Sequence, residues 1–147
     1  MATILLIEDD AADQKLVRAS IGAVNPEIKI QTANNAEDAL EILRTIIIEQ
    51  RQADLPNLIL LDLNMPGMGG REFLRRVKTH ESLRRVPIVV LTSSKAEKDI
   101  SESYLLQAAG YLHKPPSLLD LNTLMQGLEK YWFGMCKLPS WEHYGDR

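Results

Sequence analysis

Short apolar runs that end abruptly in polar residues recur along the chain. Residues 3–7, 58–61 and 86–91 form runs rich in strand formers, which is typical of strands buried on both faces of a sheet. Residues 28–33 alternate apolar with polar side chains, and the run at 111–113 is very short. Both features favour strands at the edges of a sheet. The pattern therefore predicts five strands, of which two lie at the edges.

Between these runs, apolar residues recur at the spacing of one helix face. Strands that alternate with helices favour right-handed βαβ crossovers and a mainly parallel sheet with helices on both faces. The predicted fold is α/β, a flavodoxin-like (βα)5 doubly wound parallel sheet with strand order 2-1-3-4-5. The helices are expected over about 11–23, from 36, around Phe73 to Val77, over 96–109 and from 117.

Four of the predicted strands end in residues that could do chemistry. The carboxyl ends of parallel strands share one edge of the sheet, where ligands bind in the crevice at the switch point of the strand order. We therefore expect these side chains to lie close together. They are Glu8 and Asp9 after the first strand, Asp62 after the third, Thr92 after the fourth and Lys114 after the fifth.

Three carboxylates in one crevice repel one another unless protons or a cation neutralise them. Mg²⁺ suits such a site, because it prefers hard oxygen ligands and keeps several waters. Asp9 and Asp62 are the expected direct ligands, and Glu8 is expected to bind directly or through water. The backbone carbonyl of Asn64, in the turn after Asp62, could complete the protein's share of the ligands. The expected cofactor is therefore Mg²⁺.

The same residues suit phosphoryl transfer, which depends mostly on positioning and charge stabilisation. With the metal bound, the carboxylate of Asp62 can act as a nucleophile toward phosphorus and form an aspartyl phosphate. Lys114 supplies a positive charge for one phosphate oxygen, and the hydroxyl of Thr92 can donate a hydrogen bond to another. The sequence thus predicts a phosphoacceptor that phosphorylates and dephosphorylates itself with Mg²⁺, and not a classical enzyme.

These residues resemble the response-regulator receiver family of two-component signalling. The resemblance covers about residues 3–131 and implies that a histidine kinase donates the phosphoryl group. It also implies that Thr92 and Tyr111 form a conformational switch, and that the Lys114-Pro115 bond is cis. The segments that carry it are 5–10 (LLIEDD), 61–67 (LDLNMPG), 91–93 (LTS) and 111–115 (YLHKP).

Within this family, residues 71–74, 89–97 and 131–139 resemble the stand-alone regulators paired with cyanobacterial phytochromes. This resemblance implies a phytochrome-type histidine kinase as the partner. We expect a receiver domain over 1–133 and a tail over 134–147, without an attached output domain. The output is therefore expected to be a changed protein–protein association at the face made by the fourth helix, fifth strand and fifth helix.

The composition argues against several other functions. The formal net charge is -3 and the sequence pI is about 5.6, so no broad basic surface favours direct nucleic-acid binding. No apolar run approaches the roughly 20 residues needed to span a bilayer, and the start lacks the basic segment of a secretory signal. The single cysteine, Cys136, excludes an internal disulfide and fits a reducing compartment. A cytoplasmic protein without membrane contact is expected.

Aromatic residues gather at the end of the chain. A final helix needs only one covered side, so this excess predicts a further apolar contact. We expect a homodimer, with packing back onto the domain as the alternative. Five of the eight aromatic residues lie from position 131 onward: Tyr131, Trp132, Phe133, Trp141 and Tyr144. The expected interface consists of Tyr131, Trp132, Phe133, Leu138 and Trp141.

Three alternative functions share parts of this pattern. A phosphohydrolase of the haloacid-dehalogenase type also uses an aspartate nucleophile and Mg²⁺, but it expects a second acid where Asn64 stands. A flavodoxin-like flavin carrier would need a phosphate-binding loop, whereas Glu8, Asp9 and Asp10 would repel phosphate. A receiver-like scaffold without phosphotransfer is disfavoured by the intact acceptor site around Asp62.

Overall fold

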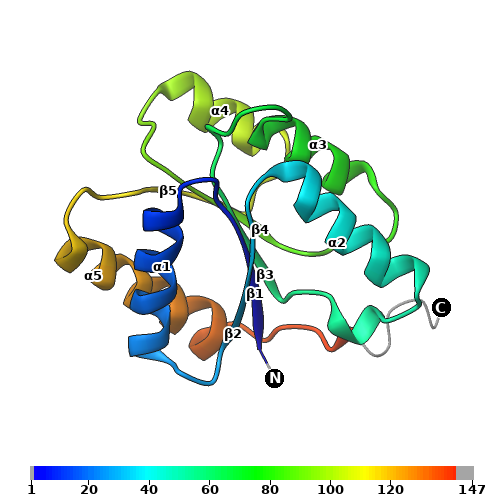
Figure 1. Ribbon diagram of the computed structural model, residues 1–147, viewed down its shortest axis with the longest axis horizontal. Helices are drawn as coiled ribbons and strands as arrows, with labels where there is room; N and C mark the ends of the chain where they lie inside the picture. The colour runs from blue at the N-terminus through cyan, green and yellow to red at the C-terminus, as the bar shows by residue number, and fades with distance from the viewer. Residues whose placement is uncertain (1, 142–147) are drawn as a thin grey trace.

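The computed structural model describes residues 2–141 and shows a five-stranded parallel sheet with helices on both faces (Figure 1). The strand order β2-β1-β3-β4-β5 confirms the predicted flavodoxin-like α/β fold. The strands are β1 (Thr3–Ile7), β2 (Lys29–Ala33), β3 (Leu58–Leu61), β4 (Ile88–Thr92) and β5 (Gly110–His113). The helices are α1 (Ala11–Val24), α2 (Ala36–Ile48), the 3₁₀-helix η1 (Gln52–Asp54), α3 (Gly70–Thr79), α4 (Glu97–Leu105), α5 (Leu118–Glu129) and the π-helix η2 (Lys130–Met135).

The core lies in two layers, one on each face of the sheet. Successive residues of a strand point to opposite faces, so Leu5 and Ile7 join the layer under α2 and α3, while Ile4 and Leu6 join the layer under α1 and α5. Figure 1 shows α1 and α5 on one side of the sheet and α2, α3 and α4 on the other. Among the described helices, none is long and apolar enough to cross a membrane.

The edge strands are as predicted, but the end of the fourth helix and the start of the fourth strand differ from the prediction by more than one residue. β2 alternates between exposed and less exposed positions, and every residue of β5 is half-buried. The fourth helix ends at Leu105 instead of 109, because Gln107 adopts a left-handed backbone (φ 72°) of the kind that terminates helices. The fourth strand begins at Ile88 instead of 86, after Pro87, which lacks an N–H for the ladder.

The described part of the tail packs back onto the domain. Trp141 is 5% exposed and belongs to the core layer under α2 and α3, where its Nε1 donates a hydrogen bond to the carbonyl of Pro56 at 3.1 Å. Trp132 and Phe133 are partly buried against the other layer. Trp141 therefore packs back onto its own domain, which was the alternative to a dimer contact. Tyr144 lies outside the described residues.

Candidate functional site

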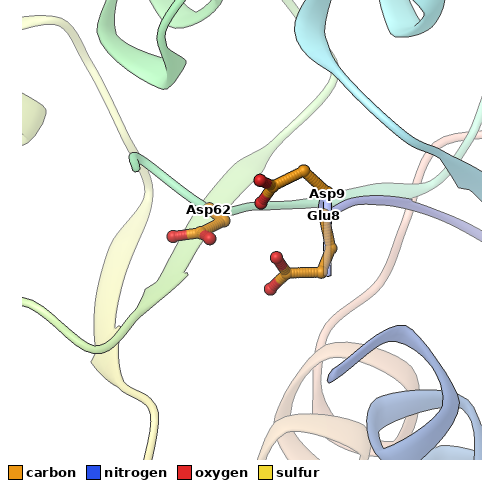
Figure 2. Close-up of side chains that lie close together, drawn as sticks. All are labelled: Glu8, Asp9 and Asp62. Carbon is orange, nitrogen blue, oxygen red and sulfur yellow. The ribbon is translucent and has the colours of Figure 1, made fainter. Parts of the chain in front are cut away.

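The acidic residues meet where β1 and β3 end. Ile7 and Leu61 are paired in the parallel register, and the Asp62 N–H donates to the carbonyl of Ile7 at 3.1 Å. One oxygen from each of Glu8, Asp9 and Asp62 lies within 4.8 Å of the others. Figure 2 shows the three carboxyl groups gathered beside the ends of these strands. The structure thus brings together the three acids that the sequence singled out.

Burial makes this cluster electrostatically costly. Glu8 is 3% exposed and Asp62 8% exposed, whereas Asp9 is exposed. Burial raises the pKa of Glu8 to about 7; the hydrogen bond from Lys114 counteracts this rise, and the charge of Asp62 adds to it. A carboxyl group with such a pKa resists ionisation near neutral pH unless more positive charge is supplied. The site therefore favours a bound cation.

Lys114 supplies part of that charge. Its Nζ donates to Glu8 Oε1 at 2.5 Å and to Asp13 Oδ2 at 3.0 Å, and its side chain is 11% exposed. Burial lowers the pKa of Lys114, but the contacts with Glu8 and Asp13 outweigh burial and raise it. Sequence reasoning missed Asp13, although its place in the first turn of α1, close after the acidic run, was a signal.

The expectation of a cis bond at Lys114-Pro115 is wrong: the described residues contain no cis peptide bond. The trans form of a bond before proline is favoured by about 0.5–1 kcal/mol. The Lys114 side chain reaches Glu8 and Asp13 with the trans bond in place. The Lys114 N–H also donates to the carbonyl of Thr92 at 2.7 Å, which fixes the backbone at the end of β5.

Thr92 is the last residue of β4, and Tyr111 is the second residue of β5. Thr92 is fully buried, and its hydroxyl has no hydrogen-bond partner among the described residues. A buried hydroxyl without a partner is unusual and costs free energy. The Tyr111 hydroxyl donates to the carbonyl of Ser94 at 3.0 Å. Asn64 donates its N–H to Asp62 Oδ1 at 3.3 Å, while the ligand role of its carbonyl stays a prediction.

Gly70, which sequence reasoning did not select, allows α3 to begin directly against the backbone of Asp62 and Leu63. A Cβ atom at this position would lie 2.6 Å from the carbonyl oxygen of Asp62 and 2.8 Å from the Cα of Leu63. Both are backbone atoms that cannot give way without moving the loop. The Gly70 N–H also donates to the carbonyl of Leu63 at 3.3 Å. The position of Asp62 therefore depends on a glycine here.

Gly70→Ala should destabilise the protein by about 1–3 kcal/mol, because the added methyl group overpacks the backbone beside Asp62. Urea unfolding measures the loss. Gly127→Ala is the matched control: it lies inside α5 with nothing within 4 Å of the added atom, so it should stabilise the protein by about 0.5–1 kcal/mol. If both variants unfold at the same denaturant concentration, the close approach at Gly70 is not the constraint described.

The chemistry of this donor set fits Mg²⁺. The ion prefers carboxylate oxygens and binds through one or two of them together with waters. Glu8, Asp9 and Asp62 offer such oxygens in one place, and the negative charge that Lys114 leaves uncompensated favours a cation. The hydroxyl of Thr92, unpartnered within residues 2–141, offers a donor for an anionic group held at the same edge of the sheet.

Comparisons with known proteins agree on one family. The response regulator receiver domain matches residues 4–126. Response regulator Rcp1 of Synechocystis sp. is 38% identical over 137 residues, which cover 93% of this chain and 92% of that protein. The solved structure of the phosphorylated cyanobacterial phytochrome response regulator RcpA has a TM-score of 0.86 at 36% identity, covering 95% of this chain and 99% of that one. The Mn²⁺-bound form of Rcp1 has a TM-score of 0.81 at 36% identity, with the same coverage.

Proposed function

The chain belongs to the response regulator receiver family, and we propose that it accepts a phosphoryl group on Asp62, with Mg²⁺ bound, from a histidine kinase of the phytochrome type. The observation that carries this proposal is the meeting of the Glu8, Asp9 and Asp62 oxygens within 4.8 Å, beside the Lys114 ammonium group. Two relatives support the phytochrome link and a metal: RcpA is a phosphorylated cyanobacterial phytochrome response regulator, and Rcp1 has an Mn²⁺-bound form.

Each side chain has a defined part in the proposed transfer. An oxygen of Asp62 forms the new bond to phosphorus as the bond between phosphorus and the donor breaks, and the leaving group departs on the opposite side. Glu8 and Asp9 would hold Mg²⁺, which neutralises charge on the phosphoryl oxygens when bound. Lys114 can turn its remaining N–H donor toward a phosphoryl oxygen. The buried hydroxyl of Thr92, which has no partner in the described part of the chain, would donate a hydrogen bond to another phosphoryl oxygen.

The proposed output is a changed association with another protein. New contacts to the phosphoryl oxygens would favour a second packing around Thr92 and Tyr111.

We also propose a homodimer through the aromatic residues at the end of the chain, from Tyr131 onward, of which Tyr131 is 53% exposed. Because Trp141 fills the core, removing the whole tail would confound the test, so Tyr131→Ser is the better variant. A dimeric wild type and a more dissociated variant on sizing would support the dimer; monomers of both would refute it.

The raised pKa of Glu8 predicts pH-dependent Mg²⁺ binding. In the folded, metal-free protein this pKa is about 7, against a usual value of 4.5, so a bound cation must displace a proton below pH 7. Mg²⁺ affinity should therefore fall as the pH drops from about 8 to about 6. The same shift makes Glu8 destabilise the metal-free fold as the pH rises from 4.5 toward 7, because the unfolded state releases its proton first.

Calorimetry in buffers of different ionisation enthalpy measures the protons released when Mg²⁺ binds. The wild type should release more protons than Glu8→Gln, which cannot carry this proton. Equal release by both proteins, or an affinity that does not change over the same pH range, would show that Glu8 does not titrate with the metal.

Incubation with acetyl phosphate tests the proposed function. With Mg²⁺, the intact mass of the wild type should increase by one phosphoryl group, and chelation of the metal should prevent the increase. Asp62→Asn is nearly isosteric and should show no adduct. A wild type that stays unmodified, or that hydrolyses unrelated phosphoesters in many turnovers, would contradict the proposal and favour the phosphohydrolase alternative.

A further inference from the structure

Ser94 joins three elements close to the switch residues. It lies two residues after Thr92, and its carbonyl accepts the hydrogen bond from the Tyr111 hydroxyl at 3.0 Å. The Ser94 hydroxyl donates to Asp99 in the first turn of α4 and accepts from the N–H of Ala96 at 3.2 Å. Ser94 therefore links the end of β4, the tyrosine of β5 and the beginning of α4.

Arg71 connects Ser94 and its contacts to the loop that follows Asp62. Its guanidinium group donates to the other carboxylate oxygen of Asp99, and its Nε lies 2.7 Å from Glu102 Oε2. Arg71 is the second residue of α3, and the residue before it, Gly70, is hydrogen-bonded to the carbonyl of Leu63. A continuous chain of contacts thus runs from the loop after the phosphoacceptor, through α3 and α4, to the tyrosine of β5.

The contacts of Asp99 with Arg71 and Ser94 are expected to be strong. Arg71 and Asp99 make a charge-assisted hydrogen bond, and the Asp99 side chain is only 14% exposed. The hydroxyl of Ser94, followed by the guanidinium of Arg71, lowers the pKa of Asp99, so the carboxylate is charged at neutral pH. Only Ser93 separates Thr92 from Ser94, so a shift of the Thr92 backbone is passed along the chain to Ser94.

We propose that Arg71 and Asp99 are positioning residues that hold Ser94, and through it Thr92 and Tyr111, in the arrangement of the unphosphorylated protein. This inference rests on the proposed function. In the proposed switch, Thr92 moves toward the phosphoryl group together with its backbone, and this shift displaces Ser94 and loosens the contacts at Asp99. The free energy of those contacts therefore opposes the switch and sets how much phosphodonor is needed to drive it.

Asp99→Asn and Arg71→Gln test the inference with small changes. Asn keeps an oxygen that can accept from the Ser94 hydroxyl but removes the charge that holds Arg71. In saturating Mg²⁺, each variant should need about three- to tenfold less acetyl phosphate for half-phosphorylation than the wild type. Arg75→Gln is the control, because Arg75 lies on the same helix and pairs with Glu72 instead. Its half-phosphorylating concentration should equal that of the wild type.

The NMR line of a fluorinated Tyr111 distinguishes a positioning role of Arg71 and Asp99 from a general loss of stability. The protein is labelled with 3-fluorotyrosine, and the Tyr111 line is assigned with Tyr111→Phe. Before any phosphodonor is added, Asp99→Asn should shift this line toward its position in the phosphorylated wild type, and Arg71→Gln should do the same. Mg²⁺ affinity should not change in either variant.

An unchanged Tyr111 line together with an unchanged half-phosphorylating concentration would overturn the inference, as would equal effects in Arg75→Gln or a change explained by Mg²⁺ affinity. These outcomes leave the proposed function intact, provided that the wild type takes up a phosphoryl group. A wild type that takes up none overturns both.

Discussion

Replacing Glu8 by glutamine and Asp9 by asparagine together should lower Mg²⁺ affinity by about a hundredfold or more. The double variant removes two of the three carboxylates that meet within 4.8 Å and leaves only Asp62. Mg²⁺ gives up its hydration water reluctantly, so one carboxylate with two neutral amides holds it poorly. Isothermal titration calorimetry measures the affinity, and the same preparation should form little phosphoryl adduct with acetyl phosphate.

Asp10→Asn is the matched control for this loss. It removes a carboxylate one residue away, and asparagine can still cap α1 by accepting from the Asp13 N–H, as Asp10 Oδ1 does at 3.0 Å. Mg²⁺ affinity in this control should stay close to that of the wild type. If Asp10→Asn weakens binding as much as the double variant does, the effect is a general one of net charge, and the assigned ligands are wrong.

Thr92→Val should make the unphosphorylated protein more stable by about 1–2 kcal/mol. The threonine is fully buried with its hydroxyl unpartnered among the described residues, so an apolar group of the same shape removes a desolvated donor at little cost in packing. The variant can still be phosphorylated at Asp62, but the phosphoryl group finds no hydroxyl to attract. Phosphorylation should therefore no longer move the Tyr111 resonance.

Urea unfolding and the fluorotyrosine spectrum measure the two effects of Thr92→Val separately. Thr92→Ser keeps the hydroxyl, so it should keep the phosphorylation-dependent shift of the Tyr111 line while losing some stability through the missing methyl group. A Thr92→Val protein that is less stable than the wild type would mean that the hydroxyl is satisfied before phosphorylation. The proposed role of Thr92 would then need revision.

The acidic cluster could be predicted because topology converts position in the sequence into position in space. Three continuous apolar runs identify central strands, and their parallel arrangement places the residue after each strand at one edge. The register that pairs Ile7 with Leu61 then brings Glu8 and Asp62 together. No detail of side-chain packing is needed for this step, and hydrophobic pattern and strand order suffice.

Other features depend on packing that no local pattern encodes. Asp13 reaches Lys114 because of how α1 sits beside the end of β5, and Arg71 reaches Asp99 because α3 and α4 lie side by side. Trp141 donates a hydrogen bond to the carbonyl of Pro56, and the segment that leads to Trp141 has little regular structure. Such contacts arise between elements distant in the sequence, so periodicity and turn chemistry could not predict them.

The central claim, that Asp62 is the phosphoacceptor, is tested most directly by trapping the phosphoryl group where it forms. Borohydride reduces an aspartyl phosphate to homoserine, and peptide sequencing by mass spectrometry then locates the changed residue. After treatment with acetyl phosphate and Mg²⁺, homoserine should stand at position 62 alone, and chelation of the metal should prevent its formation. Homoserine at Asp9 or at any other acid, or a wild type in which residue 62 remains aspartate, would contradict the assignment.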